Sequence, residues 1–110
     1  MDKEEFEKLI TDAFQNLPKI FRKKIENLTL EVAEGVMYQD GTLILGRYQG
    51  VPLTSRTSWY GNVLPDKIII YKGSIERITQ DPGQIKRIVG EVLRHEFGHY
   101  FGLDEEDLKN

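Results

Sequence analysis

The chain contains no cysteine among its 110 residues. This absence excludes disulfide bonds, metal sites built on thiolates and cysteine nucleophiles. Histidine is also scarce, since the whole chain has two. A protein without cysteine fits the reducing cytoplasm, where disulfides are rare.

Long hydrophobic runs are missing as well. The longest run, IIIY at residues 68–71, is far shorter than the about 20 apolar residues of a membrane-spanning helix. The first ten residues, MDKEEFEKLI, are acidic and contain no apolar stretch, so we expect no signal peptide. These features predict a cytoplasmic protein with no membrane partner.

The charge balance gives no basic footprint. The chain has 15 Lys and Arg against 18 Asp and Glu, a net charge of −3, whereas nucleic-acid binders concentrate positive charge. We therefore expect no nucleic-acid partner. The length favours a single domain over residues 1–110, and we favour a monomer.

Hydrophobic periodicity predicts an α+β fold. The pattern indicates an N-terminal helix over residues 2–17, a short helical turn over 19–25, strands over 28–34, 42–48 and 66–73, and a long helix over 82–101. The last of these strands, DKIIIYKG, is expected to be central and buried on both faces. Phe6, Phe14 and Phe21 are expected in the core. Helices packed on one small sheet follow from this order.

The long C-terminal helix carries both histidines of the chain. The predicted buried face is defined by apolar residues, namely Ile85, Val89, Val92 and Leu93. Glu96 continues this face, and His95 and His99 lie beside it, one helical turn apart. Two imidazoles at this spacing can bind one Zn²⁺, while the glutamate between them serves as general base. The sequence therefore predicts a zinc site with Glu96 as the catalytic residue.

A catalytic zinc needs a third protein ligand. Gly102 is expected to end the helix in a left-handed turn, after which an acidic residue can point back. The spacing H-E-x-x-H-x-x-G-x-x leads to Glu105. Asp104 is the alternative ligand, although it is also a good N-cap for a short following helix.

The segment over residues 49–65, with two Gly and two Pro, predicts a long loop. Its functional interpretation places Arg56 or Tyr60 beside the zinc, where either can stabilise a developing oxyanion. The alternative is a surface loop without a catalytic role. No third histidine exists to take the oxyanion role.

The sequence resembles the minimal zincin-like family of predicted metallopeptidases. The resemblance rests on HEFGHYFGLDEED, on GRYQGVPLTSR and on LPDKIIIYKGSIER, and it covers nearly the whole chain. It implies a compact α+β fold: an N-terminal helix, a small mixed β-sheet and a long C-terminal zinc-bearing helix. Family members carry HExxHxxGxxD with the aspartate as third ligand, so Glu105 is a departure from the pattern.

The leading functional hypothesis is a zinc-dependent metallopeptidase acting on a peptide or protein substrate, with metal-activated water attacking the peptide carbonyl. One alternative is a regulatory module that holds zinc without catalysis, because a small frame leaves the site open. A second is a zinc-dependent endoribonuclease, since ribosomal-RNA-maturation nucleases look similar in this region. The acidic net charge, Glu96 and Glu105 argue against the nuclease.

Overall fold

The computed structural model describes residues 1–25, 27–52 and 65–103 of the chain. The elements follow the order α1 (Lys3–Gln15), α2 (Lys19–Arg22), β1 (Leu28–Ala33), β2 (Met37–Gln39), β3 (Thr42–Ile44), β4 (Gly46–Gln49), β5 (Asp66–Tyr71), α3 (Lys72–Ile78) and α4 (Pro82–Tyr100). The expected α+β class with a mixed sheet and a long C-terminal helix is confirmed.

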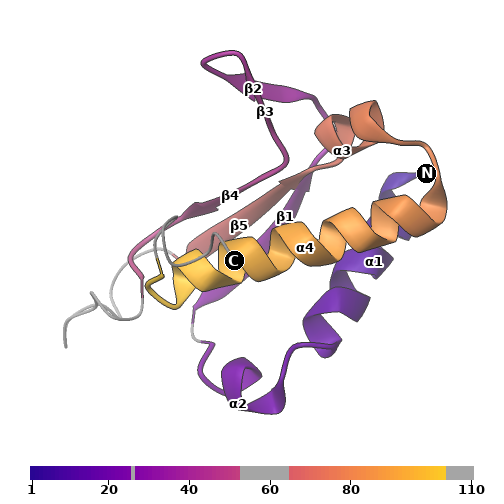
Figure 1. Cartoon of the computed structure of the whole chain (residues 1–110). Coiled ribbons are helices and arrows are strands. Elements are labelled where there is room, and N and C mark those ends of the chain that lie inside the picture. The colour runs from indigo at the N-terminus through magenta and orange to yellow at the C-terminus, as the bar shows by residue number, and fades with distance from the viewer. Residues whose placement is uncertain (26, 53–64, 104–110) are drawn as a thin grey trace.

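A three-stranded sheet of order β1-β5-β4 forms the centre of the fold. β1 runs parallel to β5, with Leu28 opposite Asp66, and β4 runs antiparallel to β5, with Gly46 opposite Ile70. β5 is thus the central strand, as its β-branched run predicts. β2 and β3 form a separate antiparallel hairpin that projects from the sheet (Figure 1).

The single strand expected over residues 42–48 is divided in two. Asp40 and Gly41 have positive φ values of 51° and 78°, the conformation of a two-residue hairpin turn. This turn pairs β3 with β2, whereas β4 pairs with β5 after a break at Leu45. The prediction was wrong here because the apolar run LIL continues across a change of pairing partner.

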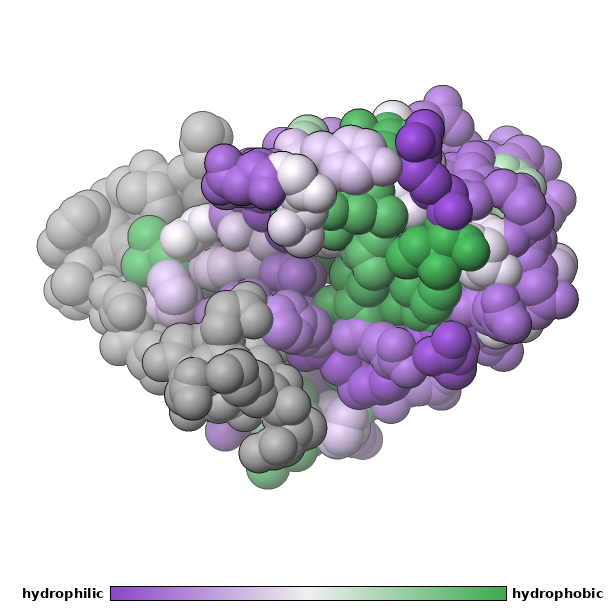
Figure 2. All heavy atoms as spheres, turned by 45° about the horizontal axis from the view of Figure 1, so that its top comes forward, coloured by the Kyte–Doolittle hydropathy of each residue, from purple (hydrophilic) through white to green (hydrophobic). Residues whose placement is uncertain are grey.

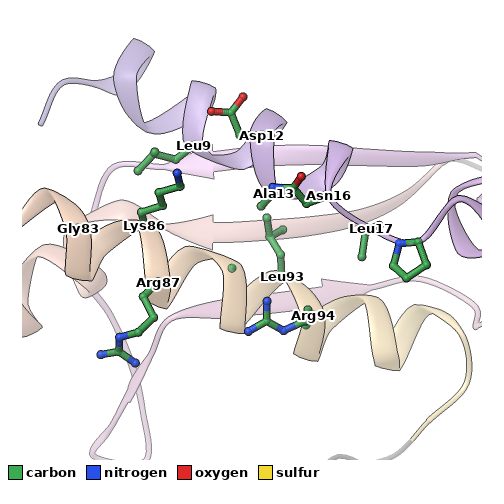
Figure 3. Close-up of a pocket in the computed structure, with 12 residues that line it drawn as sticks. Leu9, Asp12, Ala13, Asn16, Leu17, Gly83, Lys86, Arg87, Leu93 and Arg94 are labelled. Carbon is green, nitrogen blue, oxygen red and sulfur yellow. The ribbon is translucent and has the colours of Figure 1, made fainter.

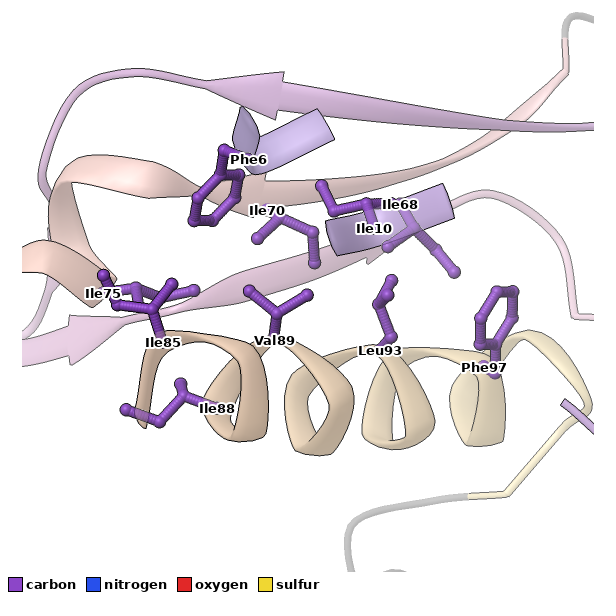
Figure 4. Close-up of a cluster of buried hydrophobic side chains, with 10 residues drawn as sticks. All are labelled: Phe6, Ile10, Ile68, Ile70, Ile75, Ile85, Ile88, Val89, Leu93 and Phe97. Atoms are coloured by element: carbon purple, nitrogen blue, oxygen red, sulfur yellow. The ribbon is translucent and has the colours of Figure 1, made fainter. Parts of the chain in front are cut away.

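The hydrophobic core lies between one face of the sheet and two helices. Ile68 and Ile70 of β5 are fully buried against this face. α1 and α4 cover it together, and their side chains meet those of β5 (Figure 4). From the helices the core takes Phe6, Ile10, Ile85, Ile88, Val89, Leu93 and Phe97, and from α3 it takes Ile75.

One helix was not expected, and one expectation needs correction. The sequence patterns did not predict α3, which follows β5 directly and buries Ile75 completely. Phe21, expected in the core, keeps 44% of its surface exposed and contacts the ring of Phe101 at a centroid distance of 5.5 Å. It lies on α2, a single helical turn that has no buried residue.

Within the described part of the chain, no helix is long and apolar enough to cross a membrane.

An ion pair with little solvent contact holds α3. Lys72 Nζ donates to Glu76 Oε1 at 2.9 Å, and the α-amino group of Met1 lies 3.3 Å from Glu76 Oε2. The hydrogen bond from Lys72 is the main cause that holds the pKa of Glu76 below its ordinary value of 4.5. A carboxylate with a lowered pKa in the folded state stabilises the fold above its unfolded pKa.

We therefore expect Glu76→Gln to lower the free energy of unfolding by roughly 1 kcal/mol at pH 7. The difference from wild type should shrink as the pH falls below about 4.5, where the carboxylate becomes protonated. Denaturant unfolding at several pH values measures it. Glu91→Gln is the control, because Glu91 pairs with Arg87 on an exposed surface; an equal loss in both variants would contradict the expectation.

Candidate metal centre

Hydrogen bonds to backbone groups fix both ends of α4. At the start, the Asp81 side chain accepts from the backbone N–H of Gln84 at 2.9 Å. At the end, the N–H of Gly102 donates to the His99 carbonyl and that of Leu103 to the Gly98 carbonyl, both at 2.9 Å. Gly102 has a φ of +96°, so the helix closes in a Schellman turn. The role of Gly102 at the end of the helix is confirmed.

Glu96 lies on the buried face of α4. Only 7% of its surface is exposed, and it follows Val89 and Leu93 along the face that meets the core. A carboxylate on such a face costs free energy unless a polar partner or an ion compensates for lost hydration. The prediction that a carboxylate occupies the place of a core residue is confirmed.

His95 and His99 lie side by side on the flank of this face, and both are partly exposed. Their ring centroids are 4.9 Å apart and their planes are nearly perpendicular, at 82°. Two imidazoles that bind one tetrahedral zinc through nitrogen at ~2.0–2.1 Å have centroids roughly 5 Å apart. The spacing of these two rings therefore fits a shared zinc ion.

A backbone carbonyl orients one of the two imidazoles. His99 Nδ1 lies 2.9 Å from the carbonyl oxygen of Leu103. Because a carbonyl can only accept, the hydrogen atom must be on Nδ1, and Nε2 of the neutral ring then carries the lone pair. Histidines that bind zinc are commonly oriented in this way. Sequence reasoning found Gly102 but missed that its turn presents the Leu103 carbonyl to His99.

The other predicted site residues cannot be placed. Asp104, Glu105, Arg56 and Tyr60 all lie outside the described residues. Within residues 1–25, 27–52 and 65–103, no three or more His, Asp or Glu side chains gather to hold a metal ion. A third ligand therefore stays a prediction from the spacing of the motif.

Two hollows lie on opposite flanks of α4. One, of about 410 Å³, lies between α1 and α4 and is lined by both apolar and polar residues of the two helices (Figure 3). The other, of about 370 Å³, lies between α4 and the segment that joins β3 to β4. His95 and Glu96 both line this second hollow, which places the predicted base beside an accessible space.

A buried carboxylate on β5 accepts hydrogen bonds from β4 and from the residues that follow it. Asp66 is 1% exposed and accepts hydrogen bonds from the Tyr48 hydroxyl and from the backbone N–H of Val51. Gly50 packs so closely on this carboxylate that a β-carbon would collide with it. The Tyr48 ring also meets Tyr100 of α4 edge-on at 6.0 Å. Sequence reasoning missed Asp66 because it appears as a polar first residue of a strand.

Comparison with known proteins decides the family. The model of the zincin-like metallopeptidase family matches residues 21–110. The chain belongs to this family. Membership indicates a function of the metallopeptidase type for this zincin-like chain, and families of this type usually bind zinc.

No curated protein matches the zincin-like chain with significance. Among solved structures, a conserved hypothetical protein from T. thermophilus is similar, with a TM-score of 0.65 and 21% sequence identity. The match covers 90% of this chain and 92% of that one. At this identity the likeness concerns the fold alone.

We expect Gly102→Ala to disturb His99 through the helix end. An alanine at a φ of +96° is strained by about 1–2 kcal/mol, so the turn that carries the Leu103 carbonyl should open. Nitrogen-15 NMR of the metal-free protein should show the Nδ1–H tautomer of His99 in wild type and a mixture of tautomers in the variant.

Gly90→Ala is the control for this experiment. Gly90 lies inside α4, and the nearest atom to an added β-carbon is Arg94 Nη1 at 3.5 Å. This substitution should raise stability by about 0.5–1 kcal/mol and leave the tautomer unchanged. An Nε2–H tautomer in the wild-type protein would refute the orientation argued for His99.

Proposed function

We propose that this protein is a zinc-dependent metallopeptidase that hydrolyses peptide bonds, with Glu96 as its general base. The observation that carries the proposal is the position of Glu96. It is a buried carboxylate on the core face of α4, and it lines a hollow together with His95. A structural role alone does not account for a carboxylate placed at the wall of an accessible space beside two imidazoles.

His95 and His99 would hold the zinc, with Glu105 or, as the alternative, Asp104 as third ligand. Support comes from the 4.9 Å separation of the two rings and from the hydrogen bond that fixes His99. Bound there, zinc would supply Lewis-acid chemistry: it would polarise a peptide carbonyl and make water acidic enough to lose a proton near neutral pH.

Glu96 would move protons in this reaction. Its carboxylate takes a proton from the attacking water and passes it to the nitrogen of the leaving amine. Its burial favours this role, because a charge in a poorly hydrated site is held in one orientation and interacts more strongly with the reacting groups. Arg56 and Tyr60 stay the candidates for stabilising the oxyanion.

Glu96→Gln is the direct test, because it retains the size of the side chain and removes its charge. Peptide hydrolysis should fall by at least ~100-fold, while zinc content measured by elemental analysis stays at the wild-type level. His95→Ala is the companion variant and should lose both zinc and activity. Hydrolysis that survives Glu96→Gln would overturn the mechanism, and a zinc-loaded wild type inactive on a broad peptide library would favour a non-catalytic zinc module.

A second experiment assigns the third ligand. Glu105→Ala should weaken zinc binding by more than the ~10–100-fold typical of residues outside the ligand shell. Asp104→Ala should change zinc affinity much less, since that residue is expected to cap the following segment. Competition with a chromophoric chelator measures both affinities. The reverse order of effects would assign the site to Asp104.

A further inference from the structure

The hollow between α1 and α4 has a mainly apolar wall. Its apolar lining comes from both helices and from the segment that follows α1, and it includes Leu9, Ala13, Leu17 and Leu93 (Figure 3). Leu93 is buried, whereas the other three keep part of their surface exposed. A volume of about 410 Å³ lies within the range of ~300–1,000 Å³ that ligand sites occupy, and such sites combine apolar walls with a few polar groups.

Two cationic side chains of α4 also line this hollow. Lys86 lies one helical turn before Gly90 and Arg94 lies one turn after it, so the three positions share one side of the helix. The Arg94 side chain folds back over the glycine: its Nη1 atom lies 3.5 Å from the place that a β-carbon of residue 90 would take. Within the described part of the chain, neither Lys86 nor Arg94 forms an ion pair or a side-chain hydrogen bond.

A neighbouring ion pair on α4 shows what these two cations lack. Arg87 donates to Glu91 at 2.9 Å, one turn further along the helix, and pairs at this spacing stabilise a helix. For both Lys86 and Arg94 the position one turn away in the hollow is residue 90, and Gly90 carries no side chain. Glycine also lowers the stability of a helix interior, so an acidic residue there would serve the helix alone better. The empty place between the two cations therefore fits an anion from outside the chain.

We propose that the hollow between α1 and α4 binds a small amphipathic anion, a molecule with a negatively charged head group and a short apolar body. The head group takes the place above Gly90, where Lys86 and Arg94 can both reach it with charge-assisted hydrogen bonds. The apolar body lies along Leu9 and Leu93, where binding removes apolar surface from water.

The α1 side of the hollow favours one direction of the ligand. Asp12 and Asn16 line that side, and the carboxylate of Asp12 repels a negative head group, which is therefore expected against α4. The described lining residues include neither His95 nor Glu96. Binding in this hollow is thus independent of the proposed peptidase activity.

Apolar surface also lies elsewhere on the molecule. Figure 2, which brings the hairpin side of the molecule forward, shows a hydrophobic area bordered by hydrophilic residues. The second hollow, which Leu43 and Val92 help to line, also includes His95. A probe with an apolar tail can bind there, and its head group can bind zinc, so a test must locate the ligand as well as measure its affinity.

Octanoate is a suitable probe, because it joins one carboxylate to an apolar chain. In the full chain, with or without zinc, it should shift the methyl NMR signals of Leu9, Ala13 and Leu93 and leave those of Leu43 and Val92 unchanged. Three further probes are acetate, which lacks the apolar chain, octylamine, which has the opposite charge, and inorganic phosphate. Each should bind at least ~10-fold more weakly than octanoate.

Substitutions test the role of the two cations. Lys86→Gln and Arg94→Gln should each weaken octanoate binding by ~10-fold, since a hydrogen bond between charged groups is lost. Gly90→Glu should abolish binding, because its carboxylate takes the place of the head group, and it should raise the melting temperature. Lys8→Gln is the matched control: it removes an exposed lysine of α1 that is not among the described lining residues, and it should bind octanoate as wild type does.

The possible outcomes separate this site from the proposed function. Shifts confined to Leu43 and Val92, or binding that is lost when zinc is removed, would place the ligand on the other flank of α4 and overturn the site. Affinity for acetate, octylamine or phosphate equal to that for octanoate would exclude an amphipathic anion, and an equal loss in Lys8→Gln and Arg94→Gln would reduce the effect to general surface charge. Octanoate bound as expected by a protein that cleaves no peptide would support the site and refute the peptidase, whereas peptide hydrolysis without octanoate binding would refute the site alone.

Discussion

The burial of one face of α4 is the constraint on which the candidate site depends. Ile85, Val89, Leu93 and Phe97 point from this helix into a core shared with α1 and β5 (Figure 4). Burial of such side chains contributes about 1.5–3 kcal/mol each, so rotation of α4 about its axis is strongly opposed. The orientation of α4 that buries these side chains also fixes the direction of every other side chain on the helix.

This constraint explains how a small fold can hold the side chains of the candidate site rigidly. Glu96 is held on the packed face, and His95 lies on the flank that faces the segment joining β3 to β4. Because the core already holds α4 in place, the side chains of the site lie on a rigid element and need little further ordering. The turn at Gly102 adds the remaining restraint, because it brings the Leu103 carbonyl to His99.

The position of β4 decides what surrounds these groups. Gly46 lets the strand contact Val92 directly, and the neighbouring segment turns into the hairpin before it can cover the helix. The result is a hollow between these segments that His95 and Glu96 help to line.

Local patterns in the sequence determined much of this protein. The helical period placed Glu96 on the buried face, Gly102 marked the end of α4, and the β-branched run of β5 marked the central strand. These features depend on near neighbours, for which spacing and backbone preference are sufficient. The placement of His95 and His99 on the same side of α4 likewise follows from helical geometry alone.

Only the tertiary structure decided the features that depend on distant partners. The run from Thr42 to Tyr48 divides because its halves pair with different strands, and no local property of the run records that change. Asp66 becomes a buried acceptor because Tyr48 and Val51 reach it across the sheet. The hollow beside His95 lies where β4 meets α4 at Gly46, a contact between segments that lie far apart in the sequence and close together in the fold.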